Sequence, residues 1–216
     1  GLLFSVILKR RIRMIKNLSD SILFQNTHDT LTKLPNRALS GKIINKRIEQ
    51  NPDLTFALVS LDIDDFANVN ELLGYQFGDN IILSLTDTLS KLLDKGDSIS
   101  RNGDGFILIL DISNRTRTQL NQLLNKILVI VSSERVIDHQ TLFITCSMGI
   151  SVYPKDGQDF SELFRAADTA LRHIKGVRKN SYNFYTEDYH ITRVNRIKKV
   201  NELKKSIDQE ELYLLY

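Results

Sequence analysis

The sequence predicts an α/β (α+β) fold, in which a central, mostly antiparallel five-stranded sheet is flanked by helices. Short apolar runs of strand length alternate along the chain with longer segments of helical periodicity. The run at residues 55–63 is too apolar to have one wet face, which indicates a sheet covered on both sides. Residues 98–110 hold Asn102-Gly103-Asp104-Gly105 between two apolar stretches, a pattern typical of a β-hairpin.

The elements follow in the order β-α-α-β-β-α-β-α-β, with helical extensions at both ends. Apolar spacing predicts a connecting helix over residues 9–25, and Pro35 precedes a helix that begins near Asn36. After the strand at 55–63 we expect a helix over 66–73, a glycine break, and a second helix that ends near Leu93. After the hairpin the pattern predicts a helix over 116–131, a strand over 142–153, a helix over 159–175 and a short strand over 182–185.

Composition indicates one soluble, globular domain. The 216 residues are 42% hydrophobic and 25% charged, and the net charge of +3 is too small to argue for nucleic acid. Basic clusters near both ends lack interleaved aromatic residues, so we expect no nucleic-acid partner. Cys146 is the one cysteine, which excludes an intramolecular disulfide and indicates a reducing compartment.

The first residues are apolar and run into a basic cluster. Residues 2–8 alone are far shorter than the roughly 20 apolar residues that span a bilayer. One interpretation is the cut end of a transmembrane helix with its positive flank on the cytoplasmic side. This would place the domain in the cytoplasm, tethered to the inner membrane. The other interpretation is a helix that packs against a partner helix.

Acidic residues gather where the strand at 55–63 ends. Strand alternation puts Asp62 and Asp64 on one face and Ile63 on the other, and Asp65 follows directly. Converging carboxylates are what Mg²⁺ needs when it bridges to phosphates. A polar turn that closes the strand explains the same residues without a ligand. The hairpin turn is likewise explained by backbone geometry alone, so the residues by themselves leave a ligand site open.

Five segments in order, from His28 to about Tyr185, resemble the GGDEF family of diguanylate cyclases. Their order and intervals make the resemblance specific, although no single segment would be. The segments are HDTLTKLPNR at 28–37, LDIDDFANVNELLGYQFGD at 61–79, GDSISRNGDGFILIL at 96–110, TCSMGISVYP at 145–154 and FRAADTALRHIKGVRKNSYNFY at 164–185.

The resemblance implies a sheet like the palm of nucleotide polymerases and a GTP substrate. In this family two GTP-loaded domains meet face to face, and each 3′-hydroxyl attacks the α-phosphate of the other GTP with help from Mg²⁺. The implied metal ligands are Asp62, Ile63 and Asp104, and the implied catalytic residues are Asp104 and Lys175. The implied substrate contacts are Asn70 and Asp79 for the guanine base, the turn of Ile63, Asp64, Asp65 and Phe66 for phosphates, and Gly103 and Lys179.

The departures from the family pattern gather at this site. In the signature, Asn102 replaces the first glycine and Gly105 replaces the glutamate. Ala67 stands where the family has a phosphate-facing lysine, and Lys179 replaces an arginine. Removing one preorganised electrostatic group typically costs about a hundred- to a thousand-fold in rate. We therefore expect a domain that binds GTP without efficient turnover. The alternative is a weak cyclase in which Asp62 and Asp104 hold Mg²⁺.

The inhibitory site of the family, Arg-x-x-Asp, would fall at residues 94–97. Asp97 is present, but Asp94 stands in place of the arginine. Because an aspartate cannot clamp a phosphate, we expect no product inhibition through this site.

We therefore divide the chain into three parts. Residues 1–27 form a membrane-proximal or signalling linker helix, and residues 28–186 form a degenerate GGDEF domain. Residues 187–216 resemble a linker helix and the truncated start of an EAL phosphodiesterase domain; the alternative is a helix that packs back on the domain. In the tandem arrangement GTP binding or homodimerisation would regulate the downstream EAL domain.

Overall fold

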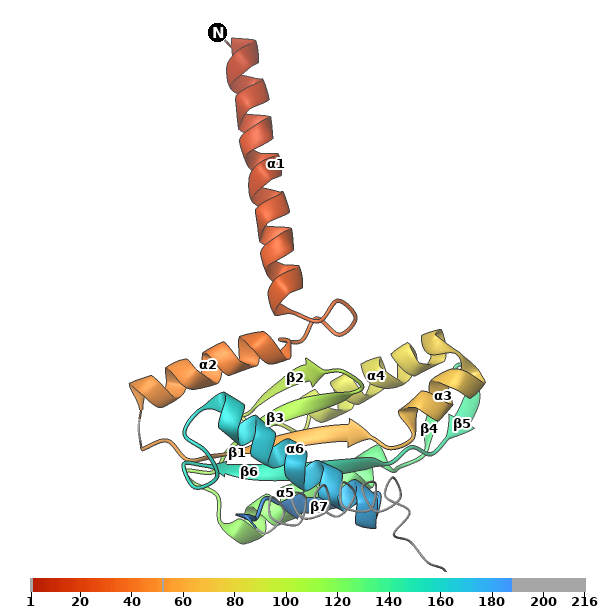
Figure 1. The fold of residues 1–216 in the computed structure, drawn as a ribbon. Coiled ribbons are helices and arrows are strands. Elements are labelled where there is room, and N and C mark those ends of the chain that lie inside the picture. Colours follow the sequence, from red (N-terminus) through yellow and green to blue (C-terminus); the bar gives the residue numbers. More distant parts are fainter. Residues whose placement is uncertain (1, 52, 188–216) are drawn as a thin grey trace, which may run out of the picture.

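The computed structural model describes residues 2–51 and 53–187, so the predicted EAL segment lies outside the described residues. Its centre is a five-stranded sheet of order β2-β3-β1-β6-β7, in which only the β6–β7 pair is parallel (Figure 1). The predicted mostly antiparallel sheet is thus confirmed. The strands are β1 (Phe56–Ile63), β2 (Ser98–Asn102), β3 (Gly105–Asp111), β6 (Cys146–Tyr153) and β7 (Tyr182–Phe184).

Helices cover both faces of the sheet, which explains why β1 is apolar along its length. Alternate β1 side chains, Phe56 and Leu58, pack with residues of α2 (Arg37–Gln50) and α6 (Phe160–Val177). The intervening side chains, from Ala57 to Ile63, pack into the larger core with α3 (Phe66–Leu73), α4 (Tyr75–Ser90) and α5 (Arg117–Val131). Burial of both faces leaves the strand ends as the places where polar side chains gather.

The N-terminal helix α1 (Leu2–Thr27) projects away from the sheet and its helices (Figure 1). It contains the helix predicted over residues 9–25 and extends past it in both directions. No helix among the described residues is long and apolar enough to cross a membrane. Asn36 joins α1 to the domain, because its side chain donates to Asn26 O (2.9 Å) and accepts from Leu39 N (3.0 Å) as the N-cap of α2.

The loop between α1 and α2 continues onto the edge of the sheet. The backbone N–H of Arg101, in β2, donates to Pro35 O (2.9 Å), and Asn36 forms a bridge with Arg101. Asp29 stabilises the loop by accepting from both the N–H and the hydroxyl of Thr32 (2.7 Å each). The segment at 28–37 therefore lies beside the β2–β3 hairpin.

The sequence did not predict the small hairpin of β4 (Arg135–Ile137) and β5 (Gln140–Leu142). The single strand predicted over 142–153 overlaps the end of β5 and the whole of β6. The hairpin turns at Asp138 and His139, which both have positive φ (48° and 64°). A two-residue turn of this kind normally carries glycine or asparagine, so Asp-His gave no turn signal.

Candidate functional site

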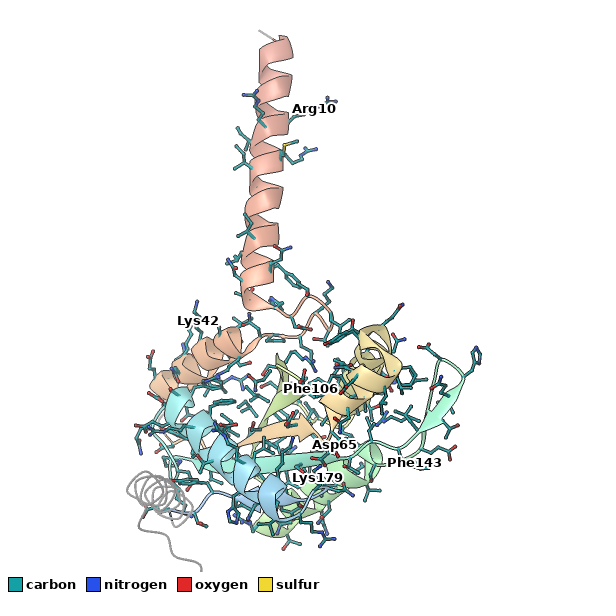
Figure 2. All side chains as sticks on the ribbon, turned by 45° about the vertical axis from the view of Figure 1, so that its right-hand side comes forward. Arg10, Lys42, Asp65, Phe106, Phe143 and Lys179 are labelled. Atoms are coloured by element: carbon teal, nitrogen blue, oxygen red, sulfur yellow. The ribbon has the colours of Figure 1, made fainter. Side chains whose placement is uncertain are left out.

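The predicted site residues meet where β1 ends and β3 begins. Asp62, near the end of β1, lies opposite Gly105 on β3 and opposite Ser147 on β6. The last turn of α6 and the loop that follows it bring two lysines to the same end of the sheet. Figure 2 labels Asp65 and Lys179 there.

Lys175, in the last turn of α6, forms an ion pair with Asp62. Its ammonium nitrogen also lies 4.0 Å from Oδ1 of Asp64. The side chains of Lys175 and Asp62 remain 28% and 35% exposed, so water and ligands can reach the pair. Asp62 and Asp64 thus lie on one side of β1, as strand alternation predicted.

Asp64 is held by protein groups rather than presented to solvent. Its side chain is 2% exposed, and its carboxylate accepts hydrogen bonds from Thr145 Oγ1 (2.7 Å), Ser147 Oγ (2.8 Å) and Asn180 N (3.1 Å). Its backbone N–H donates to Thr145 O (2.9 Å). Asp64 therefore anchors the β1–α3 turn to β6 and to the loop after α6.

Asp65 lies at the tip of the β1–α3 turn with φ 56°, in the left-handed region. Lys179 donates to both of its carboxylate oxygens (2.6 and 2.8 Å), and this hydrogen bonding raises the pKa of Lys179. The neighbouring Ile63 and Phe66 are buried in the core, at 2% and 6% exposure. Only their main chain is left to contact a ligand.

The hairpin turn carries the altered signature. Gly103 has φ +56° and open space around it, and Asp104 beside it is exposed. Gly105 differs, because a Cβ on it would lie 2.0 Å from the carbonyl oxygen of Leu61 and 2.9 Å from Cα of Asp62. Strands β1 and β3 approach each other so closely at this point that only glycine fits. The position where the family carries glutamate has no room for a side chain here.

The two residues expected to contact guanine are Asn70 and Asp79, which lie on the consecutive helices α3 and α4. Asn70 of α3 packs against Gly78 of α4, where a Cβ would lie 1.9 Å from Asn70 Oδ1. This oxygen is buried and has no hydrogen-bond partner within the chain. Asp79 follows Gly78 and is exposed. The pair thus offers one unpartnered buried acceptor and one accessible carboxylate.

An open cavity of about 650 Å³ adjoins Asp79. Its walls come from the loop at the start of the domain, from α4 and from the hairpin: His28, Asp29, Thr30, Leu31, Asn36, Arg37, Ala38, Asp79, Arg101, Asn102 and Gly103. Sequence reasoning did not single out Arg101. Burial lowers the pKa of its guanidinium, an effect opposed by nearby carboxylates, of which Asp29 has the largest influence. Arg101 directly precedes the signature turn, and this position is the feature of the sequence that could have identified it.

The donor set at the strand end does not fit the Mg²⁺ ion that the family implies. Among residues 2–51 and 53–187, no three His, Cys, Asp or Glu side chains are grouped to hold a metal. Asp62 faces an ammonium group, Asp64 is saturated by hydrogen bonds, and Gly105 supplies no oxygen. At a nucleotide site Mg²⁺ is usually bound by one or two carboxylates together with phosphates and water, and neither Asp62 nor Asp64 presents an unpaired carboxylate here.

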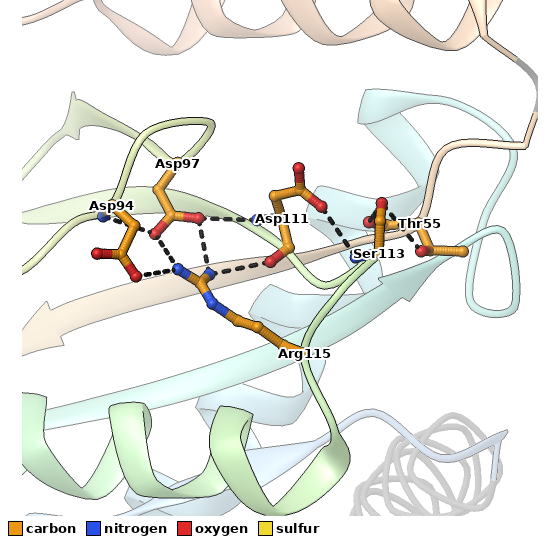
Figure 3. Close-up of polar contacts among 6 residues, drawn as sticks. All are labelled: Thr55, Asp94, Asp97, Asp111, Ser113 and Arg115. Carbon is orange, nitrogen blue, oxygen red and sulfur yellow. Dashed lines mark hydrogen bonds and ion pairs between the residues drawn. The ribbon is translucent and has the colours of Figure 1, made fainter.

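The position of the predicted inhibitory site lies at the opposite end of β3. There Arg115 donates to both oxygens of Asp97 (2.8 Å each) and to Asp94 (2.7 Å), as Figure 3 shows. Asp97 also accepts from the backbone N–H of Asp94 and of Asp111. Hydrogen bonding to Asp97 raises the pKa of Arg115. The carboxylate of the expected motif is therefore engaged inside the domain, and sequence reasoning missed Arg115.

Comparisons with known proteins support the resemblance. Residues 26–181 match the family described as diguanylate cyclase, GGDEF domain. The chain is 30% identical over 192 residues to MucR of Pseudomonas aeruginosa, a bifunctional diguanylate cyclase/cyclic di-GMP phosphodiesterase. It is 26% identical over 188 residues to PdeR of Escherichia coli, a cyclic di-GMP phosphodiesterase. The matches cover 88% and 87% of this chain, but this chain spans only 28% of either relative.

Solved structures share the fold. The GGDEF domain of TpbB (YfiN) from P. aeruginosa superposes with a TM-score of 0.70 at 23% identity, covering 78% of this chain and 99% of that one. The coiled coil and GGDEF domain of DgcB from Caulobacter crescentus, in complex with c-di-GMP, gives 0.68 at 22% identity, covering 82% and 94%. At these identities the likeness concerns the fold.

Proposed function

The chain belongs to the GGDEF family of diguanylate cyclase domains, and we propose that it is a catalytically impaired member that binds guanine nucleotide as a regulatory module. The observation that carries the proposal is Gly105. Where the family has a glutamate, β3 lies against the carbonyl oxygen of Leu61 and leaves no space for a side chain. A catalytic carboxylate is thus lost together with the room for it.

The guanine-binding side of the site supports retained binding. Of the residues implied to contact the base, Asn70 packs against Gly78, and Asp79, the next residue in the chain after Gly78, borders the open cavity. A buried acceptor without a partner, such as Asn70 Oδ1, costs about 1–3 kcal/mol. A ligand N–H that reaches this oxygen would recover the cost, which favours a ligand with donors on its edge.

The proposed role in the longer protein is control of a downstream EAL phosphodiesterase. Relatives named as cyclic di-GMP phosphodiesterases carry the matching region as a small part of their length, which supports this arrangement. In it, nucleotide binding or homodimerisation of the GGDEF domain would set the activity of the hydrolase. Helix α1 would connect the domain to an N-terminal input, with the membrane tether as part of the same proposal.

The test is calorimetric titration of GTP into the 216-residue chain, followed by an assay of the spent mixture for cyclic di-GMP. We expect saturable binding without product. Formation of cyclic di-GMP at the rate of an active cyclase would contradict impairment. The absence of binding by any guanine ligand would contradict the regulatory role.

A weak cyclase is the second candidate, because Lys175 contacts Asp62, which places two implied catalytic-site groups together. A weak cyclase would form cyclic di-GMP slowly, and Asp104→Asn would abolish this product. Asp87→Asn, a change at another acidic residue, is the control and should leave product formation unchanged. A trace signal that survives Asp104→Asn would come from a contaminating enzyme and would leave the impaired domain as the explanation.

A further inference from the structure

The carboxylates at the strand end are paired with lysines of the protein, and this pairing affects which part of a nucleotide the domain can recognise. Asp62, Asp64 and Asp65 contribute three negative charges, and Lys175 and Lys179, which contact them, contribute two positive charges. Three minus two leaves one net negative charge. A phosphate chain would therefore meet ammonium groups that already neutralise carboxylates.

Other sources of phosphate binding on this side are also reduced. Helix α3 has no basic residue, and Glu71 is its one charged side chain. Ala67 occupies the position where the family has a phosphate-facing lysine. The backbone N–H of Asp64 in the expected phosphate-binding turn donates to Thr145 O. The carboxylates of this turn are already paired, Asp62 with Lys175, Asp65 with Lys179 and Asp64 with hydrogen-bond donors of the protein, so a divalent cation that bridges to phosphates would have to displace these partners.

The base side of the site has the opposite character. Asn70 Oδ1 is buried without a partner and lies against Gly78, and the exposed carboxylate of Asp79 follows directly. An amide oxygen and a carboxylate are both acceptors, which is the type of group that complements the adjacent N–H groups on the Watson–Crick edge of guanine. A site that leaves a buried polar group unpaired in the absence of ligand discriminates strongly for a ligand that pairs it.

We infer that this domain recognises its guanine ligand through the base, without Mg²⁺ and with little dependence on the number of phosphates. The inference rests on the proposed function and narrows it, because the ligand class becomes guanine nucleosides and nucleotides in general. Mg²⁺-bound GTP, the substrate of an active cyclase, would bind no more tightly than the other members of this class.

The experiment compares guanosine, GMP and GTP in calorimetric titrations of the 216-residue chain, each with excess Mg²⁺ and with EDTA. We expect the three affinities to agree within about threefold and EDTA to leave them unchanged. GTP binding that is tighter than guanosine binding by about tenfold or more, or that is lost in EDTA, would overturn the inference and leave the proposed function intact. Failure of all three ligands to bind would overturn both.

Two variants separate base recognition from phosphate recognition. Asn70→Ala removes the buried acceptor, and we expect it to weaken guanosine and GTP alike, by about tenfold or more. Lys179→Ala removes the cation on the turn, and we expect the ratio of GTP to guanosine affinity to stay as it is in the parent chain. A fall in GTP affinity alone would show that the lysine binds phosphate and would contradict the inference. Circular dichroism of each variant checks that the fold is retained.

Discussion

The two ends of the central sheet hold ion pairs of nearly equal length in very different surroundings. At the ligand end, Lys179 and Asp65 are 2.6 Å apart, and their side chains are 51% and 54% exposed. At the opposite end, Arg115 and Asp97 are 2.8 Å apart, and their side chains are 17% and 0% exposed. The distance between charges therefore says little about the role of each pair.

The difference lies in what replaces water around the carboxylate. Asp97 accepts hydrogen bonds from two backbone N–H groups as well as from both terminal nitrogens of Arg115 (Figure 3). A buried charge of this kind depends on all its partners. Asp65 is instead surrounded by solvent, which can replace Lys179 at little cost. The first pair is a fixed structural contact, and the second is a solvent-exposed contact that contributes little to stability.

Breaking the buried ion pair between Arg115 and Asp97 should have the largest effect on stability. Arg115→Met leaves the Asp97 carboxylate buried without its cation, and we expect the free energy of unfolding to fall by about 3–5 kcal/mol. Urea denaturation measures the change. Asp94→Asn is the matched control: the Asp94 side chain is 79% exposed, so its contact with Arg115 should contribute less than about 1 kcal/mol.

If Arg115→Met does not fold, Arg115→Lys keeps the charge but loses the planar, two-pronged contact. An intermediate loss of stability is then the expected result. Equal stability of Arg115→Met and Asp94→Asn would contradict the distinction between the two ends. Guanosine affinity should be the same in every folded variant, since the cluster lies at the far end of β3 from the nucleotide residues.

Filling the space at Gly105 should have the next largest effect. Gly105→Ala puts a methyl group against the Leu61 carbonyl, and the strain should cost about 1–3 kcal/mol in the free energy of unfolding. Gly105→Glu carries the same backbone clash, so restoring the family's residue should not restore cyclic di-GMP synthesis. A rise in product with Gly105→Glu would show that the strands separate easily and would weaken the case for impairment.

Gly103→Ala is the comparison for Gly105, because its surroundings are open and only its φ of +56° opposes a side chain. The cost of holding a non-glycine residue in this region is about 1–2 kcal/mol. The two variants thus separate backbone strain from steric overlap within one hairpin. Thermal or urea unfolding, with the cyclic di-GMP assay beside it, measures both.

The fold was largely predictable because local chemistry repeats along each element. The apolar run of β1 predicts a buried strand, and the Asn-Gly-Asp-Gly turn predicts a hairpin; each of these patterns is complete within a few residues of the chain. The β4–β5 hairpin escaped prediction because Asp138 and His139 adopt positive φ without glycine, where tertiary contacts decide. One such contact is the hydrogen bond from Asn80 to Asp138 (2.8 Å).

The site was predictable only in part. The resemblance implied that Asp62 and Lys175 belong to the site. The contact between them joins residues 113 positions apart in the chain, and no local sequence pattern predicts such a contact. The steric reason for Gly105 depends on the register that sets it opposite Asp62. Arg115 and Asp97 both lie in connecting segments, where no pattern of burial marks them beforehand.

Removing the exposed cation at the ligand end should affect stability only slightly. Lys179→Ala breaks the pair with Asp65, and because the pair is exposed we expect only a slight fall in the free energy of unfolding. Because the pair is exposed, the difference between variant and parent should shrink further in about 1 M salt. Urea denaturation at low and high salt tests this. A loss as large as that of Arg115→Met would make the two ends equivalent.

The smallest expected effect is a pH dependence at the edge of the Arg115 cluster. The pKa of Asp111 is lowered, chiefly by the hydrogen bond from the backbone N–H of Ser113 (2.9 Å). A carboxyl group with a lowered pKa stabilises the fold above its unfolded pKa, and this stabilisation disappears as the pH falls through the folded value. Asp111→Asn should therefore be slightly less stable than the parent near pH 7, by less than about 1 kcal/mol because water screens the site. The difference should shrink as the pH falls below the unfolded pKa of about 4, and it should vanish only below the lowered folded pKa, where the parent carboxyl is protonated in both states. Unfolding free energies measured from pH 7 down to about pH 2 test this. A difference that grows toward acid would reverse the sign and exclude Ser113 as the stabilising partner.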